Sequence, residues 1–168
     1  DFLDKVPSDV IVAMDEAYIE FAERSDMPDS IKLMKKYKNL IIMRTFSKAY
    51  GLASLRCGFL IADKECIDVI QRVRPPFNVS MPAQVMAEAA LKDDDHINMV
   101  VAENNKGKKY IYSELDKMGI EYVETEANFM LVKTYNGQKV FEDLLKEGVI
   151  VRFLGDKMVD GKTKILGV

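Results

Sequence analysis

The sequence predicts an α/β fold, and three observations lead to this prediction. The chain has 168 residues, 48% hydrophobic and 30% charged, which is typical of a globular protein with a substantial core. Its first half alternates short, apolar, β-branched runs with stretches of helical periodicity, the order expected of α/β proteins. Its second half has the pattern of a small α+β unit, with helices on one face of a sheet.

Two kinds of pattern predict the elements of the first half. Apolar runs without polar alternation are typical of strands buried on both faces, and apolar residues recurring on one face indicate helices. The second helix begins after Asp63, a favourable N-cap, and stops before Pro75. We therefore expect strands at residues 10–14, 40–43 and 57–62, and helices at residues 30–37 and 64–73.

The second half contains more helix. Three aspartates at 93–95 predict the start of a long helix, and Gly119 predicts its end. The proline-containing segment 74–78 is the expected joint between the halves, so we predict domains at 1–80 and 81–168. The expected helices are 82–91, 96–118 and 137–147, and the expected strands are 121–124, 128–132 and 149–151.

Charge and composition exclude several classes of protein. Lys and Arg number 24 and Asp and Glu 27, a net charge of −3 with both signs interleaved, which argues against a nucleic-acid binder. The longest apolar runs are far shorter than the ~20 residues of a membrane-spanning helix. Cys57 and Cys66 form no Cys-x-x-Cys pair and there is one histidine, so we expect no metal site and reduced thiols. No signal peptide is visible, and we expect a cytoplasmic protein.

Polar residues gather at the ends of the predicted strands in three clusters. Residues 15–18 follow the first strand, residues 44–52 follow the second, and residues 55–58 lead into the third. In open α/β sheets, ligands bind beyond the carboxyl ends of the strands. Each residue alone has an ordinary explanation, because an Asp can cap a helix, a Lys can be solvated and an Arg can form an ion pair.

The combination of these residue types indicates a more specific chemistry. A pyridoxal phosphate site needs a lysine amine for a Schiff base, an acid facing the ring nitrogen and a hydroxyl donor near the phenolic oxygen. It also needs serine and arginine side chains for the phosphate. All of these residue types occur within the three clusters.

Five segments in the same order resemble the histidinol-phosphate aminotransferase family of fold-type-I pyridoxal-phosphate enzymes. The resemblance extends from about Asp4 to about Gly155. It implies that residues 1–80 are the later part of the large cofactor-binding domain, a mainly parallel sheet with helices. Residues 81–168 would then be a small α+β domain that is incomplete at its end. The segments are 15–21, 44–56, 74–80, 128–132 and 148–152.

The resemblance also implies catalytic roles for three residues of the first half. Lys48 carries the cofactor as a Schiff base and, once freed by the substrate amine, moves a proton. Asp15 keeps the pyridine nitrogen protonated, since an opposite charge favours the charged form. Tyr18 donates to the phenolic oxygen.

Four further residues are implied in binding. Ser47 and Arg56 hold the cofactor phosphate, and Thr45 is a weaker candidate for the same group. Arg152 matches a position that faces the anionic end of the substrate, although it could equally be an ordinary surface arginine.

The implied reaction passes an amino group between L-histidinol phosphate and 2-oxoglutarate, a step of histidine biosynthesis that gives imidazole-acetol phosphate and glutamate. The family works as a homodimer whose partner chain completes the pocket. Three alternatives stay open: an aromatic aminotransferase, a phosphothreonine decarboxylase and a non-catalytic chain.

The sequence departs from the family at both ends. Members of the family are much longer, and about half of the cofactor pocket has no counterpart here, so we expect a fragment with little or no activity alone. Near the end, where the family has an arginine for the substrate carboxylate, the stretch 162–168 contains no arginine, and Lys164 in its place would be a point charge without the bidentate fork. Residues 155–163 resemble a phosphate-binding P-loop, but five residues separate the glycines instead of four, so we reject that reading.

Overall fold

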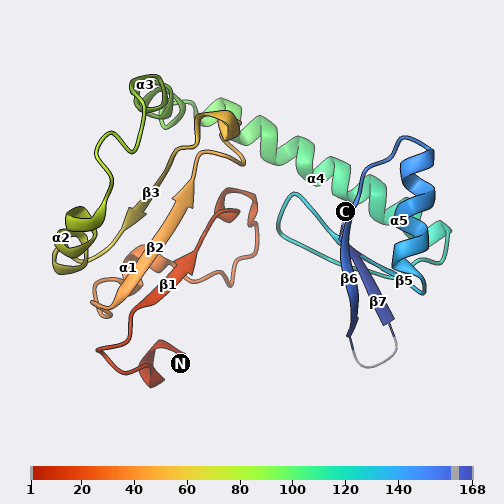
Figure 1. Ribbon diagram of the computed structural model, residues 1–168, viewed down its shortest axis with the longest axis horizontal. Coiled ribbons are helices and arrows are strands. Elements are labelled where there is room, and N and C mark those ends of the chain that lie inside the picture. Colours follow the sequence, from red (N-terminus) through yellow and green to blue (C-terminus); the bar gives the residue numbers. More distant parts are fainter. Residues whose placement is uncertain (1, 160–162, 168) are drawn as a thin grey trace. The chain divides into compact units, whose positions relative to one another are not determined.

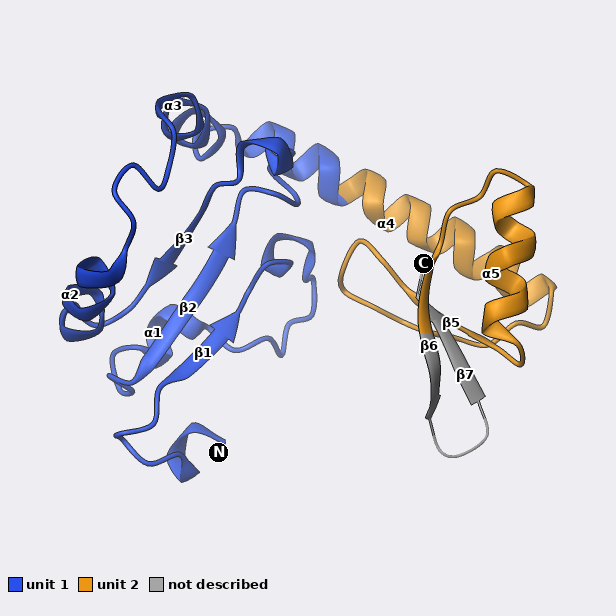
Figure 2. Cartoon of the chain, viewed as in Figure 1, with its two compact units in different colours: residues 1–101 blue, residues 102–168 orange. Residues whose placement is uncertain are grey.

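The computed structural model describes residues 2–159 and 163–167, and the side chains of residues 2–154. The chain divides into two compact units, Asp1–Val101 and Ala102–Val168, called here the first and second unit (Figure 2). The division falls within the long helix α4, Asp94–Lys117. No helix among the described residues is both long enough and apolar enough to span a membrane.

The first unit is built on a three-stranded sheet with the order β1-β2-β3 (Figure 1). Strands β1 and β2 are parallel, whereas β2 and β3 are antiparallel. The sheet is thus mixed rather than mainly parallel, because β2 and β3 are linked through a three-residue 3-10 helix, not the α-helix that usually returns a chain to a parallel strand. The strands are β1 Val12–Asp15, β2 Leu40–Thr45 and β3 Gly58–Ile61.

Besides the sheet, the first unit contains the helices α1, α2 and α3, the start of α4 and short 3-10 helices. Helix α2 begins where the sequence predicts, since the Asp63 carboxylate accepts a hydrogen bond from the Glu65 amide at 3.3 Å. Helix α1 is only one turn long, so the predicted helix at 30–37 is too long. The elements are α1 Ser30–Leu33, α2 Lys64–Val73, α3 Met81–Ala90, η1 Leu3–Lys5, η2 Ile19–Phe21 and η3 Ala53–Leu55.

The first strand differs most from its prediction. We expected residues 10–14 to be buried on both faces, but Val10 is 47% exposed and Ile11 53% exposed, and both precede β1. The expectation is wrong because β1 lies at the edge of its sheet, where only β2 pairs with it. The second strand is confirmed and extends two residues beyond Met43.

Helix α3 belongs to the first unit by its packing. Ala83 and Ala87 of this helix are buried in one cluster with Phe46 and Cys57. The segment 74–78 does separate α2 from α3, but the chain then returns to the first unit. The expected domain division between residues 80 and 81 therefore differs from the division into packed units and stays a prediction.

The second unit contains an antiparallel sheet of four strands with the order β4-β5-β7-β6. Its core contains Leu115 of α4 with Met130 and Val132. Helix α5 lies close to this sheet, because a Cβ on Gly137 would meet the Phe153 ring at 2.9 Å. The elements are β4 Tyr122–Val123, β5 Leu131–Thr134, α5 Gly137–Lys146, β6 Arg152–Val159 and β7 Thr163–Gly167.

The strand predicted at 149–151 is wrong, because the end of α5 uses these residues. Gly148 has a positive φ of 78°, and the Val149 amide donates back to the Leu144 carbonyl at 2.8 Å. This is the usual way in which a glycine after a helix satisfies the last carbonyls. Pairing begins only at Arg152.

Two of the sequence interpretations concern residues near the end of the chain. Residues 155–159 continue β6 and residue 163 begins β7, while residues 160–162, which include part of the rejected P-loop segment, lie outside the described residues. The side chain of Lys164 is also outside them.

Candidate active site

The predicted site residues of the first unit gather at one edge of its sheet, which here means the side where β1 and β2 end. Asp15 ends β1 and Thr45 ends β2, and these strands run in the same direction. Strand β3 runs the opposite way, with Gly58 opposite Thr45, so Arg56 stands just before β3 at this same edge. The mixed sheet therefore brings the segment after β1 together with the segments after β2 and before β3, which follow much later in the sequence (Figure 1).

The segment after β2 forms a compact turn that carries Ser47 and Lys48. The Thr45 hydroxyl accepts a hydrogen bond from the Ser47 amide at 3.1 Å, and the Lys48 carbonyl accepts one from the Gly51 amide at 2.9 Å. Gly51 has a φ of 71°, a conformation that favours glycine, and a Cβ there would lie 3.8 Å from Nε2 of His96. The turn therefore fixes the backbone that presents Lys48, whose side chain is exposed.

The segment after β1 carries Asp15 and Tyr18. The Asp15 carboxylate accepts a hydrogen bond from the Ala17 amide at 3.0 Å, which bends the chain just after the strand. The Lys48 amine lies 5.0 Å from the centroid of the Tyr18 ring, within the range of a cation–π contact. This contact joins the two segments through two of the predicted site residues.

Arg56 has an unusual backbone conformation for a residue with a side chain. Its φ is 51° and its ψ is 47°, in the left-handed region, and its Nη1 donates to the Ala53 carbonyl at 2.9 Å. Such conformations are found at functional sites more often than elsewhere. The guanidinium is exposed and retains further N–H donors.

Arg152 belongs to the second unit, where it begins β6 and is exposed. The other six predicted site residues all belong to the first unit. The structure therefore groups the six candidates for catalysis and cofactor binding, and it assigns the single candidate for substrate binding to the other unit.

A pair of charges at this edge was not predicted to have a role. Glu16, only 8% exposed, accepts a hydrogen bond from Nε of Arg44 at 2.9 Å, and Nη2 of Arg44 lies 2.9 Å from the same carboxylate oxygen. Glu20 is half-buried beside them, and this burial raises its pKa, while the Arg44 charge acts in the opposite direction. Burial also raises the pKa of Tyr50, and the nearby Glu20 charge adds to that rise. The register of the parallel strands β1 and β2, once known, indicates this ion pair. Glu16 and Arg44 each directly follow the last two residues that these strands place opposite each other.

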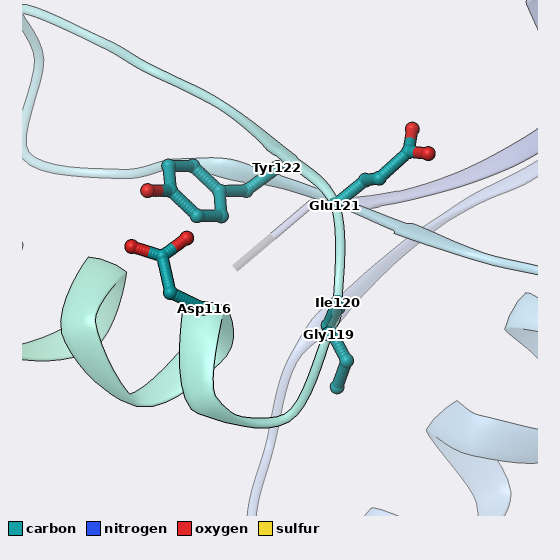
Figure 3. Close-up of a pocket in the computed structure, with 5 residues that line it drawn as sticks. All are labelled: Asp116, Gly119, Ile120, Glu121 and Tyr122. Carbon is teal, nitrogen blue, oxygen red and sulfur yellow. The ribbon is translucent and has the colours of Figure 1, made fainter.

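A hollow in the second unit is lined by none of the predicted site residues (Figure 3). Figure 3 shows the Asp116 carboxylate facing the Tyr122 ring, with Glu121 directed away from both. The pKa of Tyr122 is raised first by burial and then by the hydrogen bond and charge of Asp116. Both polar groups are engaged with each other, so this hollow is not the candidate site.

Comparison with known proteins identifies related sequences and folds. The family model for aminotransferase class I and II matches residues 1–157. Histidinol-phosphate aminotransferase 2 of Carboxydothermus hydrogenoformans is 47% identical over 154 residues, covering 90% of this chain and 42% of that protein. The histidinol-phosphate aminotransferase of Moorella thermoacetica is 46% identical over 153 residues, covering 90% of this chain and 40% of that protein.

Solved structures agree with the sequence comparison. The crystal structure of histidinol-phosphate aminotransferase from Sinorhizobium meliloti in complex with pyridoxal-5'-phosphate superposes with a TM-score of 0.88 at 26% identity. The match covers 99% of this chain and 46% of that structure. The chain thus spans less than half the length of these three relatives.

Proposed function

Because the chain belongs to the class I and II aminotransferases, we propose that the whole protein is a pyridoxal-phosphate-dependent histidinol-phosphate aminotransferase. The proposed reaction passes an amino group between L-histidinol phosphate and 2-oxoglutarate, within histidine biosynthesis. The observation that carries the proposal is the contact between Lys48 and Tyr18, with Asp15 at the same sheet edge. Relatives of 43–47% identity that bear this name support the choice of substrate.

The side chains at this edge fit the proposed cofactor in their chemistry. An amine, a carboxylate, a phenol, a hydroxyl and a guanidinium are all present, and those of Asp15, Lys48 and Arg56 are exposed to a ligand. When bound, pyridoxal phosphate supplies a ring that accepts electrons from the substrate carbon losing its proton. The protein must then hold this ring and move the proton.

Three residues would do the chemical work. Lys48 would hold the cofactor through its amine and would move a proton at the substrate Cα when that amine is free. Asp15 would hold the proton on the ring nitrogen, because an opposite charge nearby favours the protonated form. Tyr18 would donate its hydroxyl to the phenolic oxygen, and its ring lies beside the Lys48 amine.

Phosphate binding would fall to Ser47 and Arg56. Arg56 uses one N–H on the Ala53 carbonyl, and its remaining donors suit phosphate oxygens. The Thr45 hydroxyl accepts from the Ser47 amide, which supports a role in shaping the turn beside any contact with phosphate. Arg152 would face the anionic end of the substrate.

We further propose that residues 1–80 belong to the large domain of a fold-type-I enzyme, residues 81–168 belong to its small α+β domain, and the whole protein is a cytoplasmic homodimer. The dimer is what the resemblance to the aminotransferase family implies. Light scattering on the whole protein should give twice the chain mass, and a monomeric mass would contradict the dimer.

A direct assay tests the proposed function. The whole protein, loaded with pyridoxal phosphate, should form glutamate from L-histidinol phosphate and 2-oxoglutarate, and it should turn over aromatic amino acids and phosphothreonine far more slowly. Release of carbon dioxide from phosphothreonine at a comparable rate would instead favour a decarboxylase. No turnover of any of these substrates would favour a non-catalytic protein.

A further inference from the structure

The Glu16–Arg44 ion pair links the two segments that carry the proposed catalytic residues. Two guanidinium nitrogens of Arg44 contact one carboxylate oxygen of Glu16, each at 2.9 Å. The Glu16 side chain is only 7% exposed and that of Arg44 27% exposed, so water competes little for this contact. It is therefore a much more constrained pair than the ion pairs on the surface of the chain.

The pair continues the strand pairing beyond the end of the strands. The register of β1 and β2 ends with Asp15 opposite Met43, and the Glu16 amide donates to the Met43 carbonyl at 2.9 Å. Glu16 and Arg44 are the next residue in each segment. Their side chains hold the segments together at the point where the backbone hydrogen bonds stop.

The proposed catalytic residues are direct neighbours of this pair in sequence. Asp15 precedes Glu16 and is exposed while Glu16 is buried, so the two carboxylates have opposite environments. Tyr18 lies two residues further on, and Lys48 four residues after Arg44. Any change in the distance between the segments would therefore move Asp15 and Tyr18 relative to Lys48.

We propose that Glu16 and Arg44 are positioning residues that hold the Asp15–Tyr18 segment against the Ser47–Lys48 segment, so that one cofactor engages both. The inference rests on the proposed function, because it assigns the pair a task toward the same bound group. The role assigned to them is indirect. Their effect is on where the carboxylate of Asp15 and the amine of Lys48 stand.

Conservative substitutions in the whole protein test this role. Glu16→Gln keeps the shape of the side chain and removes its charge, and Arg44→Met removes the cation while Arg44→Lys retains it. The probe is pyridoxal phosphate, and the measurements are its Kd, the pH midpoint of the change in its absorption band when bound, and the thermal midpoint of the protein without it. We expect Glu16→Gln and Arg44→Met to raise the Kd at least tenfold and to shift the pH midpoint, and Arg44→Lys to recover part of both.

The Lys38–Asp63 pair supplies a matched control. Its atoms are 2.9 Å apart, and it joins the start of β2 to the end of β3 at the opposite edge of the same sheet. Lys38→Met should leave the Kd and the pH midpoint of the cofactor band unchanged. If Arg44→Met does not fold, Glu16→Gln and Arg44→Lys still provide the comparison.

Two results would separate the failure of this inference from the failure of the proposed function. If the parent protein fixes the cofactor on Lys48 after borohydride reduction but Glu16→Gln and Arg44→Lys bind it as the parent does, the positioning role is wrong and the proposed function stands. If the parent takes up no cofactor at Lys48, the proposed function fails and the inference falls with it.

Discussion

The two units use polar side chains in different ways. In the second unit, Asn104, Lys108 and Tyr112 stand at four-residue intervals on α4, and each bonds the backbone of Thr125 or Ala127, at 3.4, 3.0 and 3.0 Å. In the first unit, the polar residues at the sheet edge follow strand ends, and several are exposed. The helically spaced residues of α4 thus stabilise a loop, whereas the residues at the strand ends are the ones proposed to contact a ligand.

The Glu16–Arg44 pair is the part of the first unit that resembles the second. It is part-buried and held by a side-chain hydrogen bond, as the α4 contacts are, yet it stands directly beside the exposed residues proposed for the site. The comparison therefore predicts a separation of effects. Substitution of exposed residues at this edge should lower activity with little loss of stability. Substitution of the hydrogen-bonded residues should mainly lower stability.

The largest effect on activity is expected at Lys48. Lys48→Ala in the whole protein should lower kcat by about 1,000-fold or more, because it removes both the group that binds the cofactor and the group that moves the proton. Its thermal midpoint without cofactor should stay close to that of the parent, since the side chain is exposed. If Lys48→Ala keeps its turnover, the proposed difference between exposed and hydrogen-bonded residues is wrong.

Substitution of Asp15 should have the next largest effect on activity. Asp15→Asn removes the negative charge proposed to face the ring nitrogen and should lower kcat by about 100-fold, because the protonated ring would lose its counter-charge. Steady-state kinetics and the absorption band of the bound cofactor measure this effect. Glu126→Gln, a change of the same type in the second unit, serves as the control and should leave kcat unchanged.

The largest effect on folding is expected at the buried pair. Arg44→Met leaves the Glu16 carboxylate buried without its partner, which should cost about 3–5 kcal/mol in the free energy of unfolding. Urea unfolding followed by circular dichroism measures the loss. Lys38→Met, at the opposite edge, should change the unfolding curve little, because that lysine is exposed. Equal losses of unfolding free energy for Arg44→Met and Lys38→Met would contradict the expected difference between the buried and the exposed ion pair.

A smaller effect on folding is expected in the second unit. Tyr112→Phe removes the hydroxyl that accepts from the Thr125 amide but keeps the ring stacked on Tyr122, with centroids 4.5 Å apart. The loss should be about 1 kcal/mol in the free energy of unfolding. The kcat of the whole protein should not change, and a large loss of turnover would show that the second unit has a more direct role.

The smallest effect concerns pH and an exposed group of α5. Lys139 and Lys146 beside Asp143 lower the pKa of its carboxyl to about 2. A lowered pKa contributes stability above the unfolded value, near 3.8, and this contribution is lost as the pH falls toward about 2. Asp143→Asn should therefore make the fall in thermal midpoint between pH 4 and 2 slightly shallower, and added salt should reduce the difference.

Local sequence patterns predicted several elements because the determinants are local. The cap at Asp63 and the aspartates at 93–95 set helix starts within a few residues: α2 begins at Lys64 as predicted, and α4 begins at Asp94, two residues before the predicted start. The apolar run at 40–43 likewise predicted β2. The exposure of Val10 could not be predicted, because it depends on which strand, if any, lies beyond β1.

Longer-range features were the ones that the sequence left open. The direction of a strand cannot be deduced from an apolar run, so the antiparallel β3 was not predicted, although this direction is what brings Arg56 to the end of β2. Residues 149–151 have strand-like side chains, but the end of α5 determines their conformation. The link between Glu16 and Arg44 depends on the register of two strands, which the residue types alone do not give.

The central claim is that the edge of the first sheet holds the cofactor through Lys48. The most direct test is to add pyridoxal phosphate to the whole protein, reduce it with borohydride and map the modified residue by mass spectrometry of its peptides. We predict that the label is found on Lys48 and is lost in Lys48→Ala. A label on another lysine of the parent protein, or no label at all, would contradict the claim.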